Sequence, residues 1–243
     1  MNTGLAQRIG ELAEKTPEQL LQWASQTYGS RSAIITSFQN TGCVMIDMAW
    51  RLGTPLRVLT VDTLRLPQET LDLMREIERR YGLRVERFEP DPARLAEMVR
   101  TRGEYLFFDS REGQQLCCEV RKVEPNRRAL STVDVWITGV RRDQSSARSN
   151  GRKAALVEQQ GRHIIKVCPL FDWTEEQVWD YIRVNHVPYN TLYDRGYASI
   201  GCIVCSTPSL PGEDKRAGRW RWMNQLQQAH HKECGIHLEG SGI

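Results

Sequence analysis

Short apolar runs alternate with longer amphipathic segments along most of the chain. The first of them, at residues 32–37, indicates a short buried strand. The runs predict strands at residues 32–37, 56–62, 83–90, 133–139 and 163–170.

The segments between these runs have the apolar periodicity and the end signals of helices. Thr16, Pro17 and Gln19 stand in capping-box order at one helix start. Gly82 suits the left-handed position that ends another helix. Helices are predicted at residues 43–52, 67–82, 91–103 and 174–185.

Strands that alternate with helices in this way predict an α/β fold with one doubly wound, mostly parallel sheet flanked by helices. Ligands of such folds bind where the strands end at their carboxyl side. Here these ends are residues 36–42, 60–67 and 138–149, which carry serines, threonines, an aspartate and an arginine cluster. We therefore expect the binding site along this rim.

The composition changes after the predicted α/β unit. We divide the chain into an N-terminal helical segment at residues 1–30, a nucleotide-binding α/β domain at 31–188 and a C-terminal extension at 189–243. The α/β domain contains a pair of adjacent cysteines. The extension is rich in glycine, proline, cysteine and arginine, and combines a C-x-x-C loop, a basic segment and an irregular tail.

Charge and hydropathy exclude several classes of protein. The 243 residues carry a net charge of only +3, so no nucleic-acid partner is indicated. No apolar run approaches the ~20 residues of a membrane span, and the first residues have no apolar core typical of a signal or transit peptide. A cytoplasmic location is therefore expected, where seven cysteines are more readily metal ligands or reactive thiols than disulfides.

Four of the cysteines form two motifs. Cys117 and Cys118 are adjacent, and Cys202 and Cys205 form the C-x-x-C loop. The loop alone is compatible with a redox dithiol, a zinc site or an iron–sulfur site, and the pair could be unrelated buried residues. Adjacent helical side chains diverge by about 100°, which suits a multi-iron cluster better than one zinc ion. Four thiolates are the usual ligand set of a [4Fe–4S] cluster.

The other three cysteines differ in their surroundings. Cys43 and Cys168 lie in apolar stretches, where burial explains them. Cys234 lies in a polar tail beside His231 and Lys232, and cationic neighbours lower the pKa of a thiol from ~8.5. Cys234 is thus either a reactive thiol or an incidental exposed cysteine near a chain end.

Basic residues gather near each of the cysteine motifs. Arginine forks suit phosphate or sulfate oxygens, and convergence of these groups on one rim favours a small ligand with two or three negative charges over a merely solvated surface. Two nearby tryptophans, Trp220 and Trp222, suit either the core or a nucleotide base. The basic residues are Arg121, Lys122, Arg141, Arg142, Arg148, Lys215, Arg216 and Arg219.

Together these motifs resemble one family over nearly the whole chain after about residue 30. They are CCEVRKVEP from Cys117, TGVRRDQSSAR from Thr138, the segment from Tyr193 to Trp220, and ECGIH from Glu233. The combination resembles the assimilatory adenylyl-sulfate reductases, the iron–sulfur branch of the phosphoadenylyl-sulfate reductase family. The resemblance implies an adenine nucleotide alpha hydrolase-like fold.

The resemblance also implies a reaction. Cys234 would attack the sulfur of adenylyl sulfate and expel AMP, and thioredoxin or a glutaredoxin-like dithiol protein would release sulfite from the S-sulfocysteine for cysteine biosynthesis. Cys117, Cys118, Cys202 and Cys205 would ligate a [4Fe–4S] cluster with a structural and electrostatic role. The implied substrate-binding residues are Ser37, Asp62, Lys122, Arg142, Arg148, Arg216, Arg219 and His237. A homo-oligomer is compatible with the sequence.

One segment departs from the family pattern. The first strand of the family commonly runs into a loop of the form S-G-A-E-D, but here the loop reads SFQNTG, with Gly42 displaced and no acid. Ser37 is therefore a candidate only through its position at a strand end. Two alternatives stay open: an enzyme that also reduces the 3′-phosphorylated substrate, and a Cys₄ zinc-stabilised nucleotide-binding or RNA-modifying protein.

Overall fold

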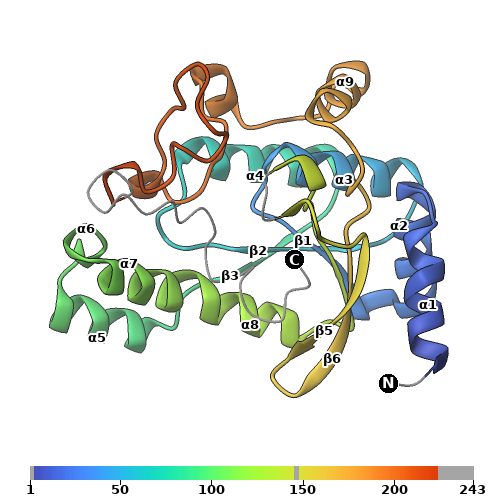
Figure 1. Cartoon of the computed structure of the whole chain (residues 1–243), viewed down its shortest axis with the longest axis horizontal. Coiled ribbons are helices and arrows are strands. Elements are labelled where there is room, and N and C mark those ends of the chain that lie inside the picture. The colour runs from blue at the N-terminus through green and yellow to red at the C-terminus, as the bar shows by residue number, and fades with distance from the viewer. Residues whose placement is uncertain (1–2, 145–147, 224–243) are drawn as a thin grey trace.

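The computed structural model describes residues 3–144 and 148–223, in which one six-stranded sheet lies between helices on both faces (Figure 1). The strand order is β3-β2-β1-β4-β6-β5. All neighbouring strands are parallel except β5, which runs antiparallel to β6. The strands are β1 Ser32–Ile35, β2 Arg57–Val61, β3 Val85–Phe88, β4 Val135–Ile137, β5 Ala154–Gln159 and β6 Arg162–Val167.

Helices cover both faces of the sheet. In Figure 1, α3, α4 and α9 lie on one side of the strands, and α5, α7 and α8 lie on the other. The helices are α1 Thr3–Ala13, α2 Pro17–Tyr28, α3 Asn40–Arg51, α4 Gln68–Tyr81, α5 Pro92–Arg102, α6 Leu106–Asp109, α7 Arg111–Cys118, α8 Glu124–Ser131 and α9 Glu175–Asn185.

The central strands are buried on both faces. Ile34 of β1 packs in the core beneath α3 and α4, whereas Ala33 and Ile35 pack against α8 on the opposite face. On β4, Trp136 faces the α8 side and its neighbours face the other. Such two-sided burial is typical of parallel sheets in α/β proteins.

The predicted helix ends are confirmed. Thr16 and Gln19 form both hydrogen bonds of the capping box at α2, and Gly82 is left-handed at the end of α4. Thr174 and Gln177 form a second capping box at α9. These local signals depend on side chain to backbone hydrogen bonds within a few residues, so sequence reveals them reliably.

A π-helical turn, Glu119–Val123, joins α7 to α8 and makes residues 111–131 one continuous helical segment. The turn begins directly after Cys118. Isolated π turns in helices often occur at functional sites, because the inserted residue redirects the side chains that follow. Here the turn carries Arg121 and Lys122.

The predictions missed β5. It pairs with β6 as a hairpin whose two turn residues, Gln160 and Gly161, both have positive φ angles. Two-residue hairpin turns favour this conformation but are usually signalled by Asn-Gly or Asp-Gly. The weaker Gln-Gly signal explains why this edge strand was not identified.

The C-terminal extension packs on the rim at the carboxyl ends of the strands. The backbone N–H of Asn40, at the start of α3, donates to the hydroxyl of Tyr193 at 3.3 Å. The backbone N–H of Ile203 donates to the carbonyl of Arg65, after β2, at 2.9 Å. These contacts support the proposal that residues from about 189 onward are an extension of one α/β domain.

Gly42 offers a test of packing at the start of α3. A Cβ atom at this position would lie 1.9 Å from Thr36 Oγ1, a short β-branched side chain that cannot move far. We expect Gly42→Ala to lower the free energy of unfolding by about 1–3 kcal/mol, as overpacking does. Denaturant unfolding measures the change.

Gly10→Ala is the matched control, since a Cβ at Gly10 in α1 would have no atom within 4 Å. It should raise the stability by about 0.5–1 kcal/mol through helix propensity. Equal effects of the two substitutions would contradict the tight contact at Gly42.

Candidate active site

A cleft with a volume of about 190 Å³ lies at the carboxyl ends of β1, β2 and β4. Its walls come from the loops after these strands, from the start of α3, from the π turn and from the C-terminal extension. The predicted rim is therefore a real depression. It occupies the position that ligands take in open α/β sheets.

The start of α3 forms one wall of the cleft. Ser37, Gln39, Asn40, Thr41 and Gly42 all line it. A helix start carries partial positive charge, which attracts anions. Here the N–H of Asn40 donates to the Tyr193 hydroxyl and that of Thr41 to the Asn40 side chain, so this wall acts through that charge. The loop contributes no acid, and the wall is neutral apart from the helix end itself.

Cationic side chains dominate the rest of the cleft. Glu175 is the one carboxylate residue among the described residues that line it. This imbalance suits an anionic ligand. The cations are Lys122, Arg141, Arg148, Lys215, Arg216 and Arg219.

Most of the described residues predicted to bind substrate do line the cleft. Ser37, Lys122 and Arg148 come from three different parts of the α/β domain, and Arg216 and Arg219 come from the extension. Gly201 makes room for the last of these, because a Cβ there would lie 2.3 Å from the Arg219 guanidinium nitrogens.

Two predicted residues do not line the cleft. Arg142 pairs with Asp172 at 2.7 Å, stacks on Phe171 and has a side chain that is 58% exposed. Asp62 is buried, and its carboxylate accepts the backbone N–H of Leu64 at 2.9 Å, which shapes the turn after β2. The expectation that these two side chains face the substrate is not met by the structure.

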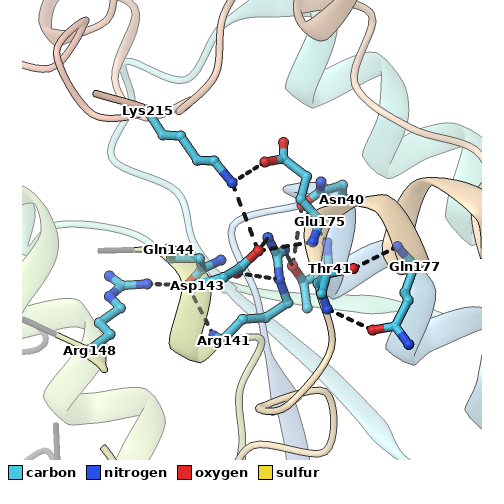
Figure 2. Close-up of polar contacts among 10 residues, drawn as sticks. Asn40, Thr41, Arg141, Asp143, Gln144, Arg148, Glu175, Gln177 and Lys215 are labelled. Atoms are coloured by element: carbon cyan, nitrogen blue, oxygen red, sulfur yellow. Dashed lines mark hydrogen bonds and ion pairs between the residues drawn. The ribbon is translucent and has the colours of Figure 1, made fainter. Parts of the chain in front are cut away.

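Arg141 faces the cleft instead of its neighbour. Its side chain is almost fully buried and donates from Nη1 to Thr41 Oγ1 at 2.8 Å. Gln144 accepts from the Arg141 backbone N–H at 3.1 Å and from Arg148 Nη1 (Figure 2). The side chains of successive loop residues point in different directions. The sequence alone does not show which of two adjacent arginines faces the cleft.

The four motif cysteines line a second, smaller cavity beside the cleft. Cys117 and Cys205 are buried, and Cys118 and Cys202 are partly exposed. The paired cysteines and the C-x-x-C loop therefore border one cavity, which favours a common role over two unrelated features. Within the described residues, no three His, Cys, Asp or Glu side chains are arranged to hold a single metal ion.

The turn after β2 connects the two cysteine motifs. Arg65 Nη1 lies 3.8 Å from Cys117 Sγ, and Thr63 Oγ1 lies 3.2 Å from Cys202 Sγ. The Thr63 carbonyl also accepts from Arg121 Nη1 at 3.1 Å, and both arginines pair with Glu104. Sequence reasoning missed these roles of Thr63 and Arg65, whose only signal was their position at the end of a buried strand.

Burial disfavours the thiolate form of two of these four cysteines. Burial raises the pKa of Cys205 to about 12, and the nearby sulfurs of Cys202 and Cys118 add to the shift. Burial likewise raises the pKa of Cys117, although Arg65 opposes the shift. Buried thiols become thiolates when positive charge compensates them, as bound metal does.

The cleft and the cysteine cavity share a wall. Lys122 and Cys202 line both of them. The π turn places Lys122 here, four residues after Cys118. A ligand in the cleft and a group held by the cysteines would therefore lie on either side of the same two side chains.

The remaining candidates have plain outcomes. Trp220 is buried with the cysteine cluster and Trp222 packs against Phe108, so both belong to the core and neither lines the cleft. Cys43 and Cys168 are fully buried, as predicted. Cys234 and His237 lie outside the described residues.

Comparison with known proteins now identifies the family. The model of the phosphoadenosine phosphosulfate reductase domain matches residues 31–208. The chain belongs to the phosphoadenosine phosphosulfate reductase family. It is 41% identical to the adenosine 5′-phosphosulfate reductase of Neisseria meningitidis serogroup A, over 93% of this chain and 91% of that protein. It is 39% identical to the Pseudomonas aeruginosa protein of the same name, over 93% and 84%.

Solved structures agree with this membership. A phosphoadenylyl-sulfate reductase of Candida auris in a phosphate complex superposes with a TM-score of 0.72 at 30% identity, covering 85% of this chain and 98% of that one. The FMN adenylyltransferase of Candida glabrata matches at 13% identity with a TM-score of 0.55 and shares the fold alone. The predicted adenine nucleotide alpha hydrolase-like fold is thus confirmed.

No helix in the described part of this family member is long and apolar enough to cross a membrane.

The burial of Cys43 and Cys168 can be tested chemically. Burial raises the pKa of Cys43 to about 12 and that of Cys168 to about 11. Both thiols therefore stay protonated at pH 8, well below these values, and the protonated form is a poor nucleophile. We expect iodoacetamide to leave both unmodified in the folded, reduced protein and to label both after denaturation.

Peptide mapping by mass spectrometry measures the labelling at each cysteine. The partly exposed Cys118 and Cys202 serve as internal controls, since they should react in iron-free protein before the two buried thiols do. Rapid labelling of Cys43 in the native state would contradict its burial.

Proposed function

We propose that this enzyme reduces adenylyl sulfate to sulfite and AMP, with thioredoxin or a glutaredoxin-like dithiol protein as the reductant. The observation that carries the proposal is the common wall of the cationic cleft and the four-cysteine cavity, formed by Lys122 and Cys202. The membership of the family and the names of the relatives support the same reaction.

The cleft supplies the binding step. Adenylyl sulfate carries a phosphate and a sulfate, and their negative oxygens would meet the start of α3 on one side and the arginines on the other. Charge on a sulfonate group opposes attack by a thiolate, so cations beside it lower the barrier. Lys122, Arg148 and Arg219 come from separate segments and could hold the two anionic groups in line.

Cys234 is proposed as the nucleophile. Its thiolate forms a bond to the sulfate sulfur while the bond from that sulfur to the bridging oxygen breaks, and AMP leaves with the electron pair. The product is S-sulfocysteine. The dithiol of thioredoxin then supplies two electrons, becomes a disulfide and releases sulfite. His237, three residues after Cys234 in the same tail, is proposed to bind the substrate.

Cys117, Cys118, Cys202 and Cys205 are proposed to hold a [4Fe–4S] cluster. Such a group, when bound, supplies a rigid link between the two cysteine segments and a fixed charge beside Lys122. The cluster donates no electron in this scheme. The Cys234 thiolate supplies the electron pair for the attack, and the dithiol supplies the two electrons for the release of sulfite. Arg65 and Arg121 compensate the negative charge of the thiolates, and the partly buried ion pairs with Glu104 hold both guanidinium groups in place.

The cysteine proposal predicts the metal content. Protein purified without oxygen should be brown and contain about four iron atoms and four sulfides per chain, as a [4Fe–4S] cluster requires. Cys202→Ser should lose the colour and most of the iron. Cys168→Ala is the matched control, because Cys168 is buried away from the cavity, and it should keep both.

Iron, sulfide and zinc assays decide between the proposals for this cavity. A colourless wild-type protein with one zinc per chain would overturn the cluster in favour of the Cys₄ zinc alternative.

The nucleophile proposal predicts a covalent intermediate. We expect wild-type protein mixed with adenylyl sulfate and no reductant to gain one sulfonate group, mapped to Cys234 and removed by reduced thioredoxin. Cys234→Ser should gain none, while Cys168→Ala should gain as much as the wild type. Intact-protein mass spectrometry followed by peptide mapping measures the adduct.

The same assay compares the two substrates. The paired cysteines favour adenylyl sulfate through the resemblance, so the 3′-phosphorylated nucleotide should sulfonate the enzyme more slowly. Equal rates would mean that the enzyme uses both. An adduct on another cysteine would refute the assignment of Cys234.

A further inference from the structure

Asp143 contacts three segments that form the cleft, although it does not line the cleft itself (Figure 2). Its two carboxylate oxygens accept from Arg141 Nε at 3.0 Å and Nη2 at 3.3 Å. Oδ2 also accepts the backbone N–H of Glu175, at the start of α9, at 2.9 Å. Lys215 Nζ, from the extension, lies 3.8 Å from the same oxygen and pairs with the Glu175 carboxylate.

The contact with Arg141 is the most buried of these. Only 2% of Arg141 is exposed, and its third nitrogen donates to Thr41 Oγ1 in the first turn of α3. The Asp143 carboxylate therefore accepts hydrogen bonds from one edge of the guanidinium group, and Thr41 accepts one from the other edge. Hydrogen bonds at two edges fix the orientation of a planar group.

We propose that Asp143 is a positioning residue, which raises the affinity of the cleft for an anionic nucleotide by holding Arg141 against α3 and Lys215 against α9. It makes no contact with the ligand. The inference rests on the proposed function in taking the ligand to be an adenine nucleotide. It adds a residue that neither the motif nor the cleft lining identifies.

The sign of the effect separates this proposal from simple electrostatics. Asp143 is negative and lies close to an anion site, so its charge alone weakens the binding of an anion. Neutralising it would then tighten binding. If Asp143 acts by positioning, neutralising it weakens binding instead, because the arginine and the lysine lose the partner that orients them.

The experiment measures the binding of AMP to the full-length enzyme by calorimetry. We expect Asp143→Asn to raise the dissociation constant by about tenfold, in keeping with the loss of a charged, two-point hydrogen-bond contact to a buried arginine. The KM for adenylyl sulfate should rise by a similar factor, with a smaller change in kcat.

Asp172→Asn is the matched control. Asp172 pairs with Arg142 through one hydrogen bond at 2.7 Å, both side chains are more than half exposed, and neither residue lines the cleft. This variant makes the same change in charge, and it should bind AMP within about twofold of the wild type. Both substitutions neutralise an aspartate paired with an arginine of this loop, but only Arg141 lines the cleft.

Arg141→Lys changes the other partner of the Asp143–Arg141 contact. It removes the guanidinium group but keeps the positive charge in the cleft. It should also weaken AMP binding, and combining it with Asp143→Asn should add little, because both remove one interaction. Should Asp143→Asn fail to fold, shown by its circular dichroism and melting temperature, Arg141→Lys and Asp143→Glu decide the matter. Asp143→Glu retains a carboxylate and should bind AMP better than Arg141→Lys does.

Unchanged or tighter AMP binding by folded Asp143→Asn would overturn the positioning role. So would an equal loss in Asp172→Asn, which would reflect a general effect on the loop. A wild-type enzyme that does not bind AMP would overturn the proposed nucleotide function, and with it this inference.

Discussion

The turn after β2 fixes the distance between the two halves of the cysteine site. It is held at several points: the Asp62 carboxylate accepts the N–H of Leu64, the Arg65 carbonyl accepts the N–H of Ile203, and the Thr63 carbonyl accepts from Arg121. Leu64 adopts a φ of 57°, a left-handed conformation that costs a bulky residue about 1–3 kcal/mol. Such strain persists only where the surrounding hydrogen bonds outweigh it. One strained turn thus ties the C-x-x-C loop to the helix that bears the paired cysteines.

The cleft depends on this arrangement because the extension reaches it through the same turn. Once Ile203 is anchored, the chain runs on to Arg216 and Arg219, which close the cleft opposite α3. Asp143, outside the cleft lining, contacts Arg141 and Lys215 within it. The absence of an acid from the loop between β1 and α3 leaves the helix end and Thr41 as the neutral face of the site. An anion entering there meets the partial positive charge of the helix end and little opposing charge.

Sequence predicted most of the fold because its signals were local. Continuous apolar runs revealed the parallel strands, and the caps at Thr16, Gly82 and Thr174 marked helix ends. The edge strand β5 escaped because its turn uses Gln160, which is not a strong turn residue. The grouping of the four cysteines followed from their motifs. The choice between Arg141 and Arg142 did not, because it depends on which of two nearby aspartates each guanidinium meets across the fold.

The shared wall has a thermodynamic consequence. Lys122 and Cys202 border both the cleft and the cysteine cavity, so each side chain takes part in two equilibria at once. If the cavity holds the proposed cluster and a nucleotide alters how firmly that cluster is bound, the cluster must alter the nucleotide's affinity by the same factor, since linkage between two binding sites is reciprocal. The binding of substrate would then change the affinity of the cavity for the cluster, without any electron transfer.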